Sequence, residues 1–231
     1  TRRSDPHDEK GGRKAPFVFP GAGEGAVRSL GSGPASCYAR AMHETSLGGT
    51  LRDYLSGEEI EETTYEEFRQ ALARLLVEER GYPRERLRAK VELPYTVDGE
   101  SYSRRVDLVA YDLEDRPALL VIFSAGDVGS YERETVAAAR LFPGGPVPLA
   151  LVTDTMQAAL LDTVTGAVLA QGMGAVPAWD ELMARTRPVE RKPLTAQQRE
   201  RLTRIFHTYC GFLFGTCCSE SCSLPPKPRK G

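Results

Sequence analysis

The chain has 231 residues, of which 41% are hydrophobic and 27% are charged, and its formal net charge is -2. This composition fits one soluble domain with a sizeable core. A net charge so close to zero gives no general attraction to nucleic acid or to anionic membranes, so either would need a local basic patch. No apolar run approaches the ~20 residues of a membrane-spanning helix, and no basic start precedes a hydrophobic segment, so the cytoplasm is the expected location.

Composition divides the chain into three parts. Residues 1–45 are rich in Gly, Pro, Ser and basic residues, which predicts a disordered arm. Met42 resembles a natural start, so the alternative is that this arm lies upstream of the true start. Residues 46–185 are predicted to form the folded domain. Residues 186–231 are predicted to form a linker, a helix capped by Thr195, and a cysteine-rich basic tail.

The first regular element predicted with a clear period is an amphipathic helix over residues 64–80. Thr63 precedes it as a cap, acids occupy its first turn, and apolar residues recur at spacings of three and four. Gly81 and Pro83 end it. Residues 46–63 show only a weak apolar pattern, and no element is assigned to them.

Three strands follow, over residues 89–97, 103–111 and 117–124. Asp98-Gly99 is a strong signal for a tight hairpin between the first two strands. Turn residues 112–116 separate the second strand from the third. These segments predict an antiparallel meander.

The second half alternates helical and extended segments. A helix over 130–142 lies between the third strand and a short buried strand at 147–152, which predicts a right-handed parallel crossover. A hairpin (156–163 and 167–170) and a short helix (179–184) follow. The fold class predicted is α/β (α+β): a mixed central sheet flanked by helices.

Asp107 lies inside the apolar second strand. A buried carboxylate is costly unless it is ion-paired, hydrogen-bonded or bound to a metal. Metal-dependent phosphodiesterases use such acids to hold Mg²⁺, often with Glu-x-Lys on the adjacent strand, where the two side chains share one face. The structural alternative is that Asp107 pairs with Arg69, Arg104 or Arg105.

The sequence resembles the N-terminal nuclease domain of type I restriction enzyme R subunits, a family with the PD-(D/E)xK, restriction-endonuclease-like fold. The resemblance is carried by Thr64-Tyr65-Glu66-Glu67-Phe68-Arg69-Gln70, Glu79-Arg80-Gly81-Tyr82-Pro83 and Arg104-Arg105-Val106-Asp107-Leu108-Val109, and it extends through residues 133–142 and 152–154. It covers about the middle half of the chain.

The resemblance implies that Glu66 is the helix acid and Asp107 the metal-binding aspartate of an Mg²⁺ site. The next motif departs from the family, because Ile122 stands where the second carboxylate is expected and Ser124 stands where the lysine is expected. Asp127 lies just beyond and is a candidate substitute acid. These residues favour a catalytically degenerate domain, and the alternative is an active Mg²⁺-dependent endonuclease with a rebuilt site.

Candidates for DNA contact are Arg69, Arg74, Arg104 and Arg105. The alternative is a solvated charged face, because glutamates at 78, 79 and 85 are interleaved with the basic residues. A protein partner is the other interaction considered. The chain has no Gly-x-x-x-x-Gly-Lys-Ser/Thr motif, so no ATP-driven motor is expected in it.

Four of the five cysteines lie near the end of the chain, at Cys210, Cys217, Cys218 and Cys222. Thiolates bind Zn²⁺ or an iron–sulfur cluster, although the spacing lacks paired Cys-x-x-Cys knuckles. Together with Cys37, the group resembles the iron–sulfur staple of some nucleases of this fold. A reversible disulfide and free tail thiols are the alternatives. A metal- or redox-sensing role is therefore a third hypothesis.

Overall fold

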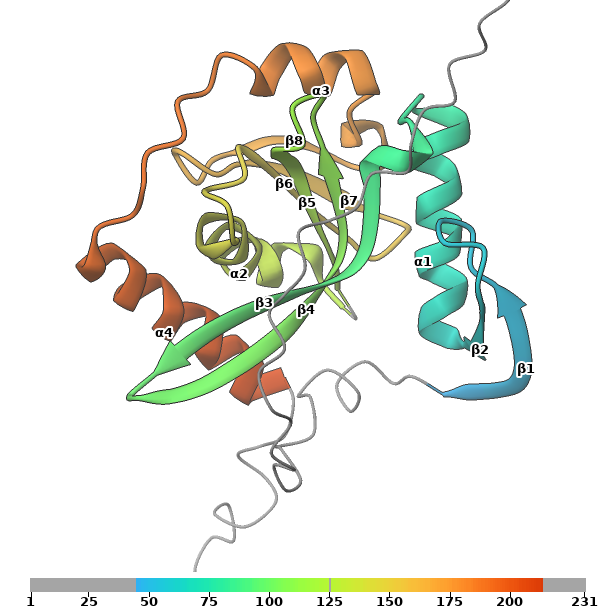
Figure 1. Ribbon diagram of the computed structural model, residues 1–231, viewed down its shortest axis with the longest axis horizontal. Coiled ribbons are helices and arrows are strands. Elements are labelled where there is room, and N and C mark those ends of the chain that lie inside the picture. Colours follow the sequence, from blue (N-terminus) through green and yellow to red (C-terminus); the bar gives the residue numbers. More distant parts are fainter. Residues whose placement is uncertain (1–44, 125, 214–231) are drawn as a thin grey trace, which may run out of the picture. The chain divides into compact units, whose positions relative to one another are not determined.

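The computed structural model describes residues 45–124 and 126–213 (Figure 1). All of them belong to one compact unit. The predicted arm lies almost wholly outside these ranges, as do Cys217, Cys218 and Cys222.

A six-stranded mixed sheet forms the centre of the fold and confirms the predicted class. Its strands follow chain order, β3-β4-β5-β6-β7-β8, and only the β5–β6 pair is parallel. Helix α2 makes the predicted crossover between these two strands. The bounds are β3 (Leu87–Val97), β4 (Glu100–Tyr111), β5 (Pro117–Phe123), α2 (Val128–Leu141), β6 (Leu149–Thr153), β7 (Ala158–Asp162) and β8 (Val168–Gln171).

A separate two-stranded hairpin precedes the first helix, in the segment to which no element was assigned. It pairs β1 (Ser46–Arg52) with β2 (Glu59–Thr63). The Thr63 side chain then caps α1 (Thr64–Arg74) by accepting the amide of Glu66, as the sequence predicts. The helix continues as a π-helical turn (Leu75–Glu79) and ends before Gly81, whose φ of +73° favours glycine.

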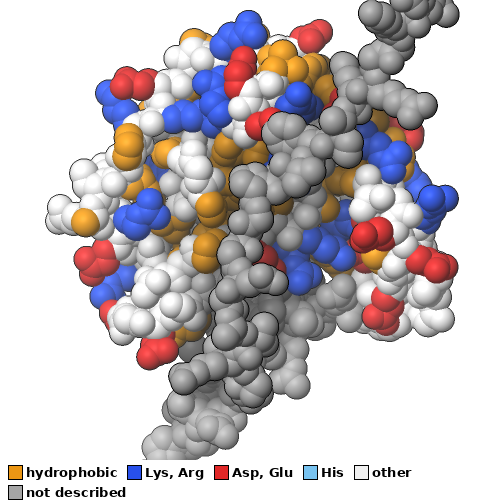
Figure 2. All heavy atoms as spheres, viewed as in Figure 1, with side chains coloured by type: hydrophobic (Ala, Val, Ile, Leu, Met, Phe, Trp, Pro, Cys, Tyr) orange, Lys and Arg blue, Asp and Glu red, His pale blue; other side chains and the backbone are white. Residues whose placement is uncertain are grey.

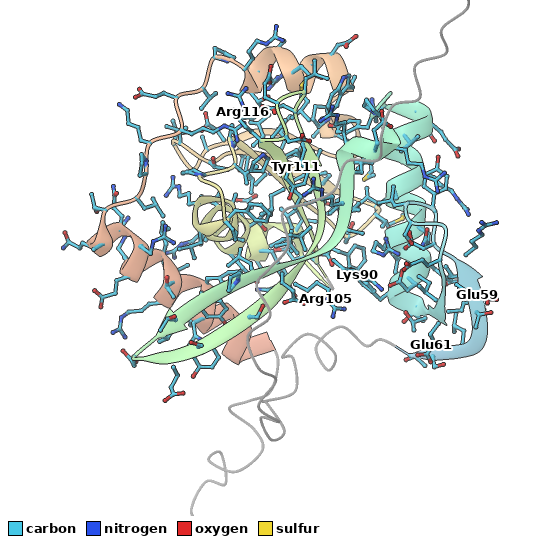
Figure 3. All side chains as sticks on the ribbon, viewed as in Figure 1. Glu59, Glu61, Lys90, Arg105, Tyr111 and Arg116 are labelled. Carbon is cyan, nitrogen blue, oxygen red and sulfur yellow. The ribbon has the colours of Figure 1, made fainter. Side chains whose placement is uncertain are left out.

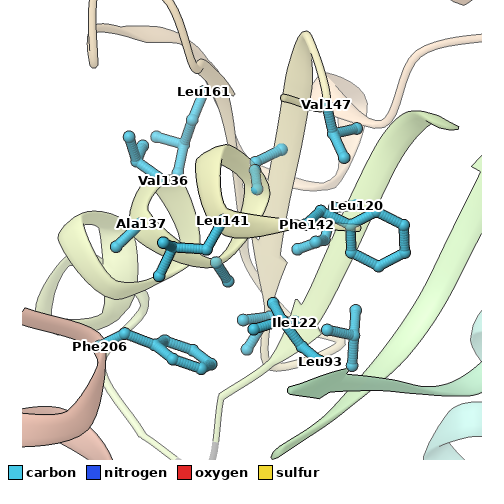
Figure 4. Close-up of a cluster of buried hydrophobic side chains, with 14 of the residues drawn as sticks. Leu93, Leu120, Ile122, Val136, Ala137, Leu141, Phe142, Val147, Leu161 and Phe206 are labelled. Carbon is cyan, nitrogen blue, oxygen red and sulfur yellow. The ribbon is translucent and has the colours of Figure 1, made fainter. Parts of the chain in front are cut away.

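Strand β5 is apolar on both sides, so both faces of the sheet need cover, and helices supply it. Leu120 and Ile122 pack with α2 and with Phe206 of α4 (Ala196–Leu213) (Figure 4), whereas Leu119 and Val121 pack with α1 and α3 (Trp179–Thr186). Helix α4 therefore shares the core of the sheet. None of the helices in the described ranges combines the length and the apolar character that crossing a bilayer requires.

A buried ion pair attaches the long β3–β4 hairpin to the helices. The guanidinium of Arg104 on β4 pairs with the carboxylate of Glu134 on α2, and it lies 5.0 Å from the ring centroid of Phe206 on α4. Glu134 is fully buried, so its charge needs this partner. Arg104 is thus a structural residue of the hairpin.

Candidate functional site

Asp107 lies where the backbone pairing of β4 with β5 ends, at Leu108 and Val121. Its side chain is buried and hydrogen-bonded. The Tyr65 hydroxyl donates to one carboxylate oxygen at 2.6 Å, and the Phe123 amide donates to the other at 2.7 Å. The carboxylate thus joins α1 to the two central strands. Of the expected alternatives for a buried acid, the structure shows hydrogen bonding.

Glu66, the predicted helix acid, is held by two cations. Arg69 Nε donates to Glu66 Oε2 at 2.8 Å, and the Lys90 ammonium pairs with Oε1. Arg69 also pairs with Asp53 in the turn after β1. The Arg69 guanidinium is buried between these two carboxylates, so it is not presented to a phosphate on the surface.

Lys90, which pairs with Glu66, has an unusual backbone conformation. The residues on either side of it pair with those on either side of Asp107, so the two lie opposite each other in the ladder. Its φ of 54° is left-handed, which costs roughly 1–2 kcal/mol for a residue other than glycine. Figure 3 shows Lys90 between the β3–β4 hairpin and α1. Such strain clusters at functional sites.

Ile122 and Ser124, where the sequence resemblance leads us to expect an acid and a lysine, carry no charge. Ile122 is buried in the core on the α2 side of the sheet. Ser124 is also buried, and its hydroxyl donates to the Gly126 carbonyl at 3.3 Å. Asp127 caps α2, where its carboxylate accepts the amide of Ser130 at 3.0 Å and the hydroxyl of the same residue at 2.9 Å. Tyr65 on α1 thus contacts Asp107, and Lys90, which lies opposite Asp107 in the ladder, pairs with Glu66 on the same helix. Asp127 serves as a helix cap.

These residues do not fit a hard divalent cation. Mg²⁺ requires near-octahedral oxygen coordination, and proteins commonly supply it with carboxylates. Within the described ranges, no group of three or more His, Cys, Asp or Glu residues is arranged to hold a metal ion. Glu66 is already paired with Arg69 and Lys90.

The remaining basic candidates differ in exposure. Arg74 is exposed, with its guanidinium 5.6 Å from the ring centroid of Tyr54. Arg105 is partly exposed and pairs with Glu92 at 3.3 Å. Lys and Arg side chains gather where Figure 3 labels Lys90 and Arg105, as the space-filling view shows (Figure 2). Of the four predicted arginines, Arg74 and Arg105 are therefore accessible to a phosphate.

An aromatic pair borders the site and was not anticipated as a functional feature. The rings of Phe68 and Phe123 stack with their centroids 5.3 Å apart and their planes 17° apart. Phe68 is 42% exposed. Helical spacing alone assigns Phe68 to the apolar face of α1, and only the tertiary structure shows its outer face open to solvent.

Cys210 lies within α4, where the structure describes the backbone and not the side chain. The other three clustered cysteines lie outside the described residues. An iron–sulfur cluster or Zn²⁺ at these thiols therefore stays a prediction.

One known protein family matches the segment that contains the site. Residues 64–177 match the family model described as type I restriction enzyme R protein N terminus. This segment runs from the start of α1 past β8, so it includes Glu66, Lys90 and Asp107. Neither the curated proteins nor the solved structures contain a significant match.

The lowered pKa of the Asp53 carboxyl predicts that the folded state loses stability at acid pH. Burial alone would raise its pKa, but the Ser56 amide and the Arg69 guanidinium outweigh burial and lower the pKa from 3.8 to about 2. A carboxyl group whose pKa is lower in the folded state stabilises the fold at pH values above its ordinary pKa of 3.8. This stabilisation is lost as the pH falls towards 2. We expect urea unfolding to show a larger loss of unfolding free energy between these pH values in the wild type than in Asp53→Asn. The exposed Asp180→Asn should match the wild type, and equal losses in all three proteins would contradict this assignment.

The left-handed backbone at Lys90 predicts that glycine is more stable than alanine at this position, which reverses the usual order in a strand. Both substitutions remove the ion pair with Glu66, but glycine adopts the left-handed conformation without strain. We expect Lys90→Gly to be more stable than Lys90→Ala by about 1 kcal/mol, measured by urea unfolding. At the neighbouring β3 residue Arg88 we expect the usual order, with glycine less stable than alanine. The usual order at both positions would show that Lys90 is not held in this conformation.

A buried acid on α1 and another on β4 thus occupy the positions that the sequence predicts, inside the matched segment. Residues 64–177 of the chain are thus similar to the type I restriction enzyme R protein N terminus family.

Proposed function

We propose that this domain is a degenerate PD-(D/E)xK module that associates with DNA and does not cleave it. The observation that carries the proposal is the uncharged pair at the motif positions, Ile122 and Ser124, beside an intact Glu66 and Asp107. Loss of one acid–base or positioning group alone commonly costs ~10²–10⁴ in rate. Here a carboxylate is missing as well as a lysine.

The charge arrangement supports the same proposal. The Lys90 ammonium pairs with Glu66, and Lys90 lies opposite Asp107 in the β3–β4 ladder, so a cation of the protein from the sheet already occupies Glu66. Binding a divalent cation to Glu66 would require breaking this pair and placing the metal beside a like charge. Ion pairs at Glu66 and hydrogen bonds at Asp107 thus supply the stabilisation that a metal gives to buried carboxylates.

DNA association is supported by accessible charge and aromatic surface on the same side of the domain. Lys90 and Arg105 are partly exposed cations near the site, and the exposed Phe68 ring stacks on Phe123 beside it. Cations contact phosphates, and exposed aromatic rings stack with bases that are not paired. These features together favour single-stranded or locally opened DNA.

A second candidate function is an active nuclease in which Lys90 replaces the lysine missing at Ser124. The observation that favours it is Lys90 itself, which has a strained backbone, lies opposite Asp107 on a different strand and pairs with Glu66. This candidate and the degenerate module predict different outcomes with DNA.

The cleavage assay separates the two functions. We expect purified protein to leave supercoiled and single-stranded DNA intact in Mg²⁺ or Mn²⁺, because the site lacks a metal-binding set of carboxylates. Asp107→Ala and Lys90→Ala are the matched variants. Cleavage by the wild type that both variants lose would contradict degeneracy and establish the active nuclease. Cleavage that survives in both would identify a contaminating enzyme.

Binding measurements test the DNA surface. With fluorescently labelled single-stranded DNA, we expect Arg105→Ala to reduce the slope of log affinity against log salt by about 0.7, because one phosphate contact is lost. We expect Phe68→Ala to weaken binding by about 1–3 kcal/mol while leaving the salt slope unchanged, because stacking releases no counterions. Arg199→Ala, on the exposed face of α4, is the control. Equal effects in all three variants would rule out this surface.

A further inference from the structure

A cavity of about 460 Å³ lies on the α4 side of the fold, apart from the acids on α1 and β4. Its volume falls in the range of small-molecule sites. Its walls come from the end of α2, the turn after β7, the segment that leads into α4, and the first turns of α4. The lining residues used below are Arg140, Val164, Glu190, Leu194, Arg201 and Leu202.

Arg140 is fixed in the wall by backbone carbonyl groups. Its Nε donates to the Thr163 carbonyl at 2.5 Å and its Nη2 donates to the Val164 carbonyl at 3.0 Å. These neutral acceptors hold the guanidinium in place without cancelling its charge. The side chain is thus an oriented cation at the cavity.

Arg201 contributes a second guanidinium from α4. Across the described ranges, neither Arg140 nor Arg201 forms an ion pair with a carboxylate. The acid in the lining, Glu190, pairs with Lys192 at 3.3 Å. Burial, and then the charge of Arg201, lower the pKa of Arg140, and the charge of Asp162 opposes them only in part, so Arg201 lies close enough to repel Arg140. Repulsion of this kind costs stability unless an anion relieves it.

The rest of the lining is largely apolar, with Val164, Leu194 and Leu202 among its side chains. An inorganic ion would leave this surface uncovered, so the cavity fits an anion attached to an apolar or aromatic body. Two guanidinium groups match a doubly charged phosphate, to which arginine donates paired hydrogen bonds. We propose that this cavity binds a phosphate monoester with a ring system, such as a nucleoside monophosphate, with the phosphate between Arg140 and Arg201.

Thermal unfolding and calorimetry with AMP, adenosine and inorganic phosphate test the proposal. We expect AMP to raise the melting temperature most, phosphate to raise it less, and adenosine to leave it unchanged. Arg201→Gln should weaken AMP binding at least about tenfold, because hydrogen bonds to the charged phosphate are lost. Arg199→Gln, two residues away on α4 and outside the cavity lining, should bind AMP as the wild type does.

Two further variants make the test specific. Phe68→Ala should leave AMP binding unchanged, which separates this cavity from the proposed DNA surface. Arg201→Glu should melt at a higher temperature than the wild type without ligand, because it can pair with Arg140, and it should lose the AMP effect. The proposal is overturned if AMP gives no stabilisation, if adenosine stabilises equally, if Arg201→Gln binds AMP normally, or if Arg201→Glu melts at a lower temperature.

Discussion

The Asp107 carboxylate ties helix α1 to the two central strands, because it accepts the Tyr65 hydroxyl with one oxygen and the Phe123 amide with the other. A buried carboxylate without such donors would be expelled towards water or protonated. The hydrogen bonds therefore fix the position of α1 at the point where β4 and β5 stop pairing. Every other feature of the candidate site is built around this junction.

A chain of alternating charges extends from the junction to the first hairpin. Lys90 and Arg69 hold Glu66, and Arg69 continues to Asp53, which also accepts the amides of the turn after β1. Removing one member would leave a buried charge without its partner, which is strongly destabilising. The acids that a nuclease would use for catalysis are thus part of the packing between β1–β2, α1 and β3.

The regular elements could be predicted from the sequence where one signal dominates. The hairpin at Asp98-Gly99, the helix cap at Thr63 and the crossover around α2 all follow from local chemistry. The β1–β2 hairpin could not be predicted, because glutamates fill much of β2 and leave little apolar alternation. The absence of charge at Ile122 and Ser124 was visible in the sequence.

The side-chain arrangement of the site was less accessible to sequence reasoning. Asp107 is identified by its place in an apolar strand and Glu66 by the family resemblance, but their partners depend on tertiary packing. A lysine in a strand has no spacing that reveals a left-handed backbone, so the role of Lys90 could not be foreseen. Arg69 and Arg104 are candidates for DNA contact in the sequence, and the structure buries both guanidiniums against carboxylates. Burial of an arginine depends on the folded neighbours and not on the local sequence.

We propose that Glu66 is held by ion pairs and Asp107 by hydrogen bonds of the protein, and that neither acid is held by a divalent metal. Electron paramagnetic resonance of Mn²⁺ titrated into the protein tests this claim most directly, with residues 45–213 as the fragment and the full chain in parallel. We expect Mn²⁺ to stay free in solution, with the same spectrum for the wild type and for Asp107→Asn. A bound Mn²⁺ signal in the wild type that Asp107→Asn loses would contradict it.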